Sequence, residues 1–262
     1  MSNGRIPRKN RFIRNVKLAI QTPAPTAEIL LVTPVWNDSS RLAGFGGELA
    51  QALARSPLDV CWIIADDGSD DGAALKKLAG EFSRIFPHVR IHFAGEHHGK
   101  GSVVRSAWGL APEAAWLAFV DADGSVTPAG VLALLETALS SETSVLGIRK
   151  RTASTQVVES PWRSLFHRGF LLAVRLLLGI PCEDPQCGVK VLRGNDYRKI
   201  AGTLRENGLA FDSELLLALK RGGSTWLEIP VNWVEKPGGT VKPLRDAWSM
   251  LAALLRIRRR FG

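Results

Sequence analysis

The most constraining feature of this sequence is a series of short apolar segments that each run directly into a polar cluster. Residues 28–35, 60–64 and 116–120 are apolar and of strand length, and the last leads into Asp121-Ala122-Asp123-Gly124. Helix-length stretches separate them. Alternating strands and helices of these lengths predict an α/β fold, with a mainly parallel sheet and helices on both faces. Ligands of such sheets bind beyond the carboxyl ends of the strands, where these polar clusters fall.

The rest of the chain supplies further elements of both kinds. A helix expected at 164–178 contains His167, Arg168 and Arg175, and it is too short and too charged to span a bilayer. The other expected strands cover 89–93, 145–148 and 224–231. The other expected helices cover 42–54, 73–86, 102–110 and an amphipathic segment at 244–258.

Asp121 and Asp123 are predicted to bind a divalent cation. Side chains two residues apart on an extended backbone point to the same side, so both carboxylates can converge on one ligand. Two hard oxygen ligands suit Mg²⁺ or Mn²⁺ whose coordination is completed by phosphates. Taken alone, Asp-x-Asp is a weak signal, because the pattern is common in loops.

Two other clusters follow strands and suit a nucleotide. Asp66 and Asp67, followed by Gly68, can accept hydrogen bonds from a ribose or a nucleobase, although an ordinary Asp-Gly turn is the better explanation when the cluster is taken alone. Gly99-Lys100-Gly101 precedes a helix, so backbone N–H groups and an ammonium could meet a diphosphate. The segment lacks the spacing of a P-loop, which disfavours a P-loop ATPase.

Several further polar residues have two interpretations. His97 and His98 are expected to be solvated loop residues rather than metal ligands, because no Cys or His partners are in sight. The run 149–151 is basic and either faces an anionic ligand or forms a solvated face. Asp212 is expected to cap the helix that begins near Phe211, although its carboxylate could also serve a site.

Charge is concentrated at the two ends of the chain. Residues 1–20 hold six Lys and Arg without an acid, and residues 242–262 hold six more against one Asp. The whole chain has a net charge of +9, so the body between the ends is slightly acidic. We therefore expect a basic N-terminal arm (1–26), a globular domain (27–240) and a basic amphipathic C-terminal helix (241–262), with ends that touch an anionic surface.

The same distribution argues against binding of nucleic acid, because the body has a slightly acidic net charge and the chain has one tyrosine. The three cysteines are sparse and lack metal-type spacing, which indicates a reduced, cytosolic protein, and the N-terminus does not read as a signal peptide.

The order of the motifs resembles that of the family 2 glycosyltransferases with the GT-A fold. The resemblance rests on segments 33–37, 66–70, 99–101 and 121–124, and then on 147–149, 184–190 and 211–215. It extends from about residue 27 to the C-terminus. A narrower resemblance, to polyprenyl-phosphate hexosyltransferases, rests on Gln186-Cys187-Gly188-Val189-Lys190, Phe211-Asp212 and Val231-Asn232-Trp233. It is strongest to the dolichyl-phosphate β-glucosyltransferase type, to which dolichol-phosphate mannosyltransferases are related.

The resemblance implies a role for each residue at a matching position. The nucleoside of a sugar nucleotide would be held by Pro34, Asn37, Asp66 and Asp67, with Lys100 near the nucleoside or the diphosphate. Asp121 and Asp123 would bind the metal. Arg149 and Arg163 would face the acceptor phosphate, and Asp184, Gln186 and Lys190 would lie near the sugar or at the acceptor mouth. Among these, Asp123, Arg149 and Asp184 are the expected catalytic residues.

The sequence departs from the family pattern at two places. Trp36 stands where Tyr is more usual, and His97-His98 occupies positions where Asn and Arg are frequent. The first change preserves packing but removes a hydroxyl, and the second affects the fine contacts to the donor. His97 and His98 are therefore left out of the expected site.

The activity implied is inverting transfer of a hexose, with glucose favoured, from UDP-glucose or GDP-mannose to a polyprenyl phosphate. The enzyme would be cytoplasmic and peripheral on the inner face of a membrane, held by its basic ends or by a membrane-protein partner. An alternative is transfer to a saccharide or small molecule, which would need a general base. A sugar-nucleotide-binding protein without turnover is disfavoured by the intact Asp121/Asp123 pair.

Overall fold

The computed structural model of the chain describes residues 26–238 and 243–262. The predicted basic N-terminal arm therefore lies, except for its last residue, outside the described residues.

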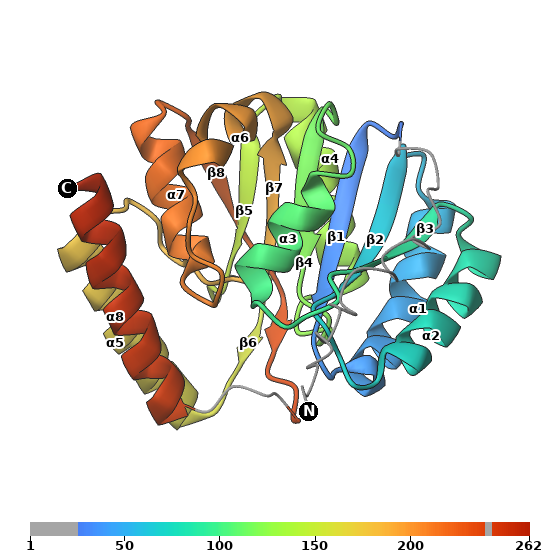
Figure 1. Cartoon of the computed structure of the whole chain (residues 1–262), viewed down its shortest axis with the longest axis horizontal. Helices are drawn as coiled ribbons and strands as arrows, with labels where there is room; N and C mark the ends of the chain where they lie inside the picture. Colours follow the sequence, from blue (N-terminus) through green and yellow to red (C-terminus); the bar gives the residue numbers. More distant parts are fainter. Residues whose placement is uncertain (1–25, 239–242) are drawn as a thin grey trace, which may run out of the picture.

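A seven-stranded sheet runs through the centre of the molecule in the order β3-β2-β1-β4-β7-β5-β8 (Figure 1). Six of its strands are parallel, and β7 alone runs antiparallel to its neighbours β4 and β5. The prediction of a mainly parallel sheet is thus confirmed. The strands are β1 (Ile29–Val35), β2 (Val60–Asp66), β3 (Val89–Phe93), β4 (Trp116–Val120), β5 (Ser144–Ile148), β7 (Val189–Arg193) and β8 (Trp226–Pro230).

Helices cover both faces of the sheet. One core cluster joins the sheet to α1 (Ser39–Arg55), α2 (Gly72–Ile85) and α4 (Pro128–Ser141). The other joins its second face to α3 (Lys100–Trp108), α5 (Pro161–Leu178), α6 (Gly194–Ile200), α7 (Phe211–Arg221) and α8 (Pro243–Phe261). A short 3₁₀ helix covers Ala201–Thr203. This arrangement confirms the predicted α/β fold.

The two faces explain why the central strands read as continuous apolar runs. Along β1, Ile29 and Leu31 belong to one core cluster, whereas Leu30 and Val32 belong to the other. Successive strand side chains point to opposite faces, so a strand covered on both sides needs apolar residues at every position. All seven residues of β2 are buried for the same reason.

Several features of the fold were not predicted. The helices α4 and α6 and the antiparallel strand β7 had no counterpart among the expected elements. A second, two-stranded sheet pairs β6 (Val157–Val158) with β9 (Trp233–Val234). The predicted cap of α7 was wrong: Ala210 precedes the helix, and Asp212 lies buried within its first turn.

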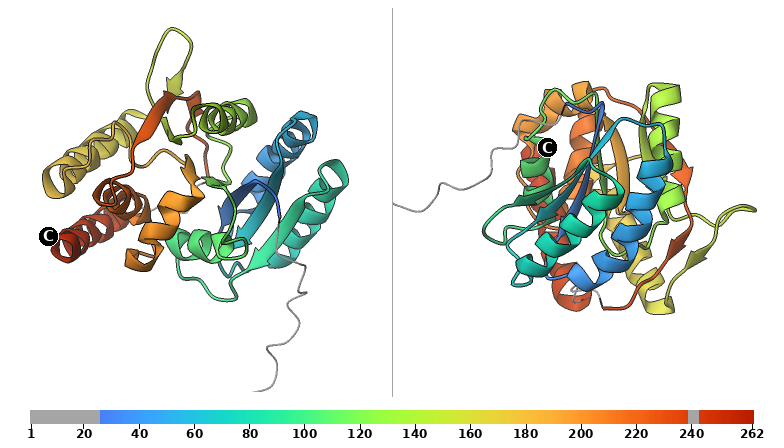
Figure 2. Two further views of the ribbon diagram at one scale, coloured as in Figure 1. Left: turned by 90° about the horizontal axis from the view of Figure 1, so that it is seen from above. Right: turned by 90° about the vertical axis from the view of Figure 1, so that its right-hand side faces the viewer.

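The helices α5 and α8 pack side by side at the end of the molecule opposite β3 (Figures 1 and 2). Leu254 and Ile257 of α8 are fully buried in the second core cluster. Arg260 of α8 forms an ion pair with the buried Glu214 of α7, at 2.7 Å. None of the helices in the described ranges is both long enough and apolar enough to cross a membrane.

Candidate active site

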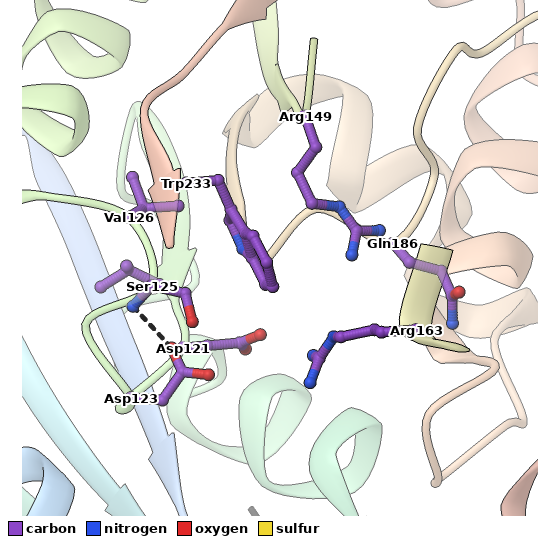
Figure 3. Close-up of a pocket in the computed structure, with 10 residues that line it drawn as sticks. Asp121, Asp123, Ser125, Val126, Arg149, Arg163, Gln186 and Trp233 are labelled. Atoms are coloured by element: carbon purple, nitrogen blue, oxygen red, sulfur yellow. Dashed lines mark hydrogen bonds between the residues drawn. The ribbon is translucent and has the colours of Figure 1, made fainter. Parts of the chain in front are cut away.

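A pocket opens at the carboxyl ends of β4 and β5, where the antiparallel β7 begins (Figure 3). The backbone N–H of Asp121 donates to the carbonyl of Gly188, at 2.8 Å, which ties the end of β4 to the segment before β7. A side chain at position 188 would collide with the Asp121 carboxylate, so glycine there lets that carboxylate keep its place. The pocket is lined by Val120, Asp121, Asp123, Ser125, Val126, Arg149, Arg163, Gln186, Gly188 and Trp233.

The second carboxylate of the predicted metal pair lies in the same pocket. Asp123 accepts a hydrogen bond from the backbone N–H of Ser125, at 2.8 Å, which fixes the turn after β4 (Figure 3). Its other oxygen lies 3.5 Å from the guanidinium of Arg41, a residue of α1 that the sequence had not singled out. The structure therefore brings Asp121 and Asp123 together, as predicted from their spacing.

Lys100 lies beside this pair. Its ammonium is 2.8 Å from Asp121 Oδ1 and 3.2 Å from Asp212 Oδ2. Burial would lower the pKa of Lys100, but the two carboxylates outweigh it and raise that pKa. Lys100 therefore carries its charge at the edge of the predicted metal site, where the first turn of α3 places it.

Asp212 forms the buried base of this cluster. It accepts from Lys190 at 2.7 Å as well as from Lys100. Burial alone would raise the pKa of Asp212, but the two ammonium groups hold it below its ordinary value. The sequence predicts Asp212 chiefly as a helix cap, and the Phe211-Asp212 motif is the signal that indicates its place in the site.

Lys190 does not lie at the acceptor mouth. Its side chain is fully buried and also donates to the carbonyl of Cys187, at 2.9 Å. It lies on β7, between the partners β4 and β5, so the sheet itself encloses it. We correct its role from ligand binding to neutralising Asp212.

Arg149 and Asp184 form a two-pronged ion pair at the opposite side of the pocket. Arg149 Nε and Nη2 donate to the two oxygens of Asp184, at 2.7 and 2.8 Å. Burial would raise the pKa of Asp184, but the hydrogen bonds and charge of Arg149 outweigh it and hold that pKa at about 2. The carboxylate of Asp184 is thus committed to orienting the guanidinium, and Arg149 is the group that faces the pocket.

Trp233 contacts both of the predicted acceptor arginines. The guanidinium carbon of Arg149 is 5.3 Å from the centre of its ring, and that of Arg163 is 5.1 Å away. Such cation–π contacts orient planar guanidinium groups. Figure 3 shows both arginines pointing into the pocket, across from the two aspartates. Trp233 was recognised from sequence only as part of a motif, because its position depends on the β6–β9 sheet.

A wider cavity of about 490 Å³ adjoins this pocket and shares Arg149 with it. Its other basic lining residues are Lys150, Arg151, His167 and Arg168. Burial, and then the charge of Arg149, lower the pKa of His167, whose Nδ1 lies 3.1 Å from Arg149 Nη2. The neutral ring can therefore accept a hydrogen bond from Arg149. The basic run at 149–151 thus borders a cavity.

The predicted nucleoside residues gather at the neighbouring ends of β1 and β2. Pro34 lies on β1, and Asn37 follows it with a φ of 50°, in the left-handed region that Asn tolerates. The side chain of Asn37 accepts from the N–H of Asp70, at 2.7 Å, and Asp66 accepts from Ser69, at 3.0 Å. The bond between Asn37 and Asp70 joins the two loops into one surface.

The carboxylate of Asp67 binds the loop that precedes α3. Its carboxylate accepts from the N–H groups of His98 and Gly99, at 3.0 and 2.7 Å, and lies 2.7 Å from His97 Nδ1. The His97 ring stacks on Trp36, with centroids 3.9 Å apart. Asp67 therefore positions the Gly99-Lys100 segment, and the two histidines are half-exposed loop residues.

The donor set fits a divalent cation that takes few protein ligands. Within the ranges that the structure describes, no group of three or more His, Cys, Asp or Glu side chains could hold a metal. Asp121 and Asp123 instead offer two carboxylates, and burial, together with the charge of Asp123, raises the pKa of Asp121 despite the opposing Lys100. The buried hydroxyl of Ser125, which also lines the pocket, has no hydrogen-bond partner. A further cation is therefore favourable there, and phosphates would have to complete its coordination.

A model of the glycosyl transferase family 2 matches residues 31–193, which is more than half of the chain. The chain belongs to glycosyl transferase family 2. This confirms the resemblance noted in the sequence, and the matched region contains Asp121 and Asp123, Lys100 and the Arg149–Asp184 pair.

Characterised proteins of the family are similar over most of the chain. Dolichyl-phosphate beta-glucosyltransferase of Dictyostelium discoideum is 27% identical, over 92% of this chain and 77% of its own length. The protein of that name from Saccharomyces cerevisiae is 29% identical, over 87% and 73%. Polyprenol monophosphomannose synthase of Mycolicibacterium smegmatis is 26% identical, over 84% and 83%.

Solved structures confirm the GT-A fold of this glycosyltransferase. Glucosyl-3-phosphoglycerate synthase of Mycobacterium tuberculosis is similar with a TM-score of 0.65 and 18% identity, over 91% of this chain and 82% of that one. Mannosyl-3-phosphoglycerate synthase of Rubrobacter xylanophilus gives 0.64 and 17%, over 90% and 74%. At these identities the likeness concerns the fold.

Proposed function

We propose that this protein is a metal-dependent, inverting hexosyltransferase that moves a hexose from a nucleotide-diphosphate sugar to a polyprenyl phosphate. The observation that carries the proposal is the division of one pocket into two walls. Asp121 and Asp123 form an acidic wall suited to a metal and diphosphate, and Arg149 and Arg163 form a basic wall suited to a second phosphate. A transferase that joins a sugar to a phosphate needs both.

The donor is a sugar nucleotide, with UDP-glucose favoured over GDP-mannose. Two of the similar proteins named above are dolichyl-phosphate beta-glucosyltransferases, as is a third from Drosophila melanogaster. Another is a polyprenol monophosphomannose synthase. A structural neighbour of TM-score 0.63 was crystallised with Mg²⁺ and UDP. The joined loops at Asn37, Asp66 and Asp67 would hold the nucleoside, next to the diphosphate on the acidic wall.

The acceptor needs no general base in this proposal. A phosphate monoester is already anionic near neutral pH, so its oxygen can attack the anomeric carbon directly. In this proposal the pocket holds the acceptor oxygen in line with the anomeric carbon and the leaving diphosphate. Attack from the face opposite the diphosphate gives a β-linked product from an α-linked donor.

Arg149 and Arg163 would bind the acceptor phosphate from two directions. Arg149 is held rigid by Asp184 and by the ring of Trp233, so it loses little freedom on binding. Arg163 is more exposed and forms a looser ion pair with Glu235, at 3.5 Å. We assign Asp184 to positioning Arg149, and Gln186, which lines the same pocket, to the sugar.

Mg²⁺ or Mn²⁺ bound by Asp121 and Asp123 would supply Lewis-acid stabilisation of charge on the leaving diphosphate. Lys100, 2.8 Å from Asp121, would add a fixed positive charge on the same side.

The reaction would take place at a membrane surface, because a polyprenyl acceptor keeps its tail in the bilayer. In this proposal residues 27–240 form the catalytic domain, the protein is peripheral on the cytoplasmic face, and an anionic leaflet or a membrane-protein partner helps to hold it. The excess of Lys and Arg at both ends of the sequence supports attraction to such a leaflet.

A small phosphorylated acceptor is the second candidate. Two structural neighbours are synthases of hexosyl-3-phosphoglycerates, which also join a sugar to a phosphate-bearing molecule. The 490 Å³ cavity bordered by basic residues could admit either kind of acceptor. Only the lipid requires an apolar surface against a membrane, and α5, which lines this cavity, exposes large apolar side chains.

The test is an incubation of the full chain with labelled UDP-glucose or GDP-mannose, each with polyprenyl phosphate or 3-phosphoglycerate, with and without EDTA. We expect label from UDP-glucose in an organic-extractable product, and its loss on chelation. Label that remains water-soluble with every acceptor would refute the lipid-phosphate proposal.

A further inference from the structure

The helix α5 exposes large apolar side chains over most of its length. Trp162 is 72% exposed and Leu176 is 73% exposed, and Leu165, Phe166 and Leu172 are exposed as well. Only two residues of the helix, Val174 and Leu178, are buried in the core. An exposed surface with five large apolar side chains is unusual for a soluble protein and indicates an interaction site.

These side chains share one face of the helix. At 3.6 residues per turn, Trp162, Leu165, Phe166, Leu172 and Leu176 fall within an arc of roughly 120°. Arg163, on one side, and Arg168 and Arg175, on the other, flank this face. The helix contains no Asp or Glu. We call Trp162, Leu165, Phe166, Leu172 and Leu176 the α5 apolar face.

We propose that the α5 apolar face enters the interface of an anionic membrane and fixes the orientation of the enzyme on it. An apolar stripe bordered by arginines is the pattern of a helix that lies in the plane of a membrane, where side chains such as Trp and Leu reach the acyl boundary and arginines meet lipid phosphates. This inference deepens the proposed function, on which it rests, by naming the element that meets the bilayer.

The rest of α5 borders the cavity that the acceptor would use. Pro161, Ser164, His167, Arg168 and Leu171 line the 490 Å³ cavity together with Arg149. One helix therefore separates the cavity from the apolar face. A lipid held in the bilayer beside α5 would have its phosphate within one helix diameter, about 10 Å, of the basic cavity wall.

The helix α8 is less suited to membrane contact than we expected from its amphipathic sequence. Its apolar residues Leu254 and Ile257 are buried against the domain, and Arg256 and Arg260 form ion pairs with Glu206. Its one largely exposed aromatic residue is Trp248, at 73%. Trp248 thus matches Trp162 in type and exposure, on a different helix.

The test compares vesicle binding by the full-length wild type and Leu172→Glu/Leu176→Glu. Both positions are exposed and outside the cavity linings, so the variant should keep its circular dichroism spectrum and Tm. We expect its binding to phosphatidylcholine vesicles containing phosphatidylglycerol to fall by about tenfold or more. We also expect Trp162→Ser to weaken binding more than Trp248→Ser does.

Unchanged vesicle binding by the double variant would overturn the proposal, as would a loss confined to Trp248→Ser. A wild-type dimer in analytical ultracentrifugation that the double variant dissociates, without vesicle binding by either, would assign the face to a second copy of the chain. Transfer to a short, water-soluble isoprenyl phosphate is measured with the same proteins. We expect the wild type and the double variant to use this soluble acceptor at equal rates. With polyprenyl phosphate embedded in vesicles, we expect the double variant alone to lose activity. If the wild type does not use the soluble acceptor, that result would count against the proposed function alone.

Discussion

The ammonium of Lys100 lies 2.8 Å from Asp121 Oδ1, so a carboxylate expected to bind a metal is already paired with a cation from α3. The same ammonium lies 3.2 Å from Asp212, which also forms an ion pair with Lys190. Two carboxylates and two ammonium groups thus form a cluster that is balanced before any ligand binds. The arriving metal would share Asp121 with Lys100 and find Asp123 as its second ligand.

Replacing Lys100 by Met should lower transfer strongly while leaving the protein folded. The variant removes a positive charge beside the diphosphate but keeps the apolar stem, and Lys190 still neutralises Asp212. We expect kcat/KM to fall about 100-fold or more, as on removal of other charged groups that stabilise a transition state. Steady-state kinetics and thermal melting check both parts. Activity near that of the wild type would contradict a role for this ammonium.

Replacing Asp123 by Ala should abolish metal-dependent transfer without unfolding the protein. Asp123 is partly exposed, and its hydrogen bond to Ser125 N and its 3.5 Å contact with Arg41 are its described polar contacts. Calorimetric titration of Mn²⁺ in the presence of UDP measures the effect directly. Asp196→Ala, which removes an ion pair with Lys199 on α6, is the control and should bind Mn²⁺ normally. Normal binding by the Asp123 variant would remove it from the metal site.

The Arg149–Asp184 pair should make stability depend on pH in the acidic range. The pKa of Asp184 falls from 3.8 to about 2 on folding, so its contribution is complete above pH 4 and lost as the pH falls through 2. A shift of this size corresponds to about 2 kcal/mol. Urea unfolding between pH 2 and 5 measures it. Asp184→Asn should be less stable at pH 5 and show a shallower loss on acidification; an identical slope would contradict the assignment.

Replacing Glu214 by Gln should loosen α8 and the loop that positions α3. The buried carboxylate of Glu214 accepts from the N–H groups of Arg205 and Glu206 and pairs with Arg260. The next residue of that loop, Asn207, accepts from Gly101 N, at 2.6 Å. We expect a loss of about 2 kcal/mol in the free energy of unfolding.

Hydrogen exchange checks where this loss occurs. Amides of α8 and of the first turn of α3 should exchange faster in the variant than in the wild type, while those of β1 and β2 should not change. Uniformly faster exchange would show a global effect without the proposed connection.

The sheet and the acidic wall could be predicted because they depend on local patterns. Apolar runs covered on both faces mark β1, β2 and β4, and the two-residue spacing places Asp121 and Asp123 on one side. The contacts of Asp212, Trp233 and Arg41 could not be predicted, because they need α7, β9 and α1 to come together from distant parts of the chain. The predicted position of Lys190 at the acceptor mouth was wrong for the same reason. Only the pairing of β7 with β4 and β5 shows that Lys190 is buried within the sheet.

The central claim is that the two walls of one pocket bind the two substrates of one reaction. Steady-state kinetics of Arg163→Ala, with donor and acceptor varied in turn, tests it most directly. Arg84→Ala, in the last turn of α2 and outside both cavity linings, is the control. We predict that Arg163→Ala raises KM for polyprenyl phosphate about tenfold and leaves KM for the sugar nucleotide unchanged. A raised KM for the donor with an unchanged KM for the acceptor would contradict this division of the pocket.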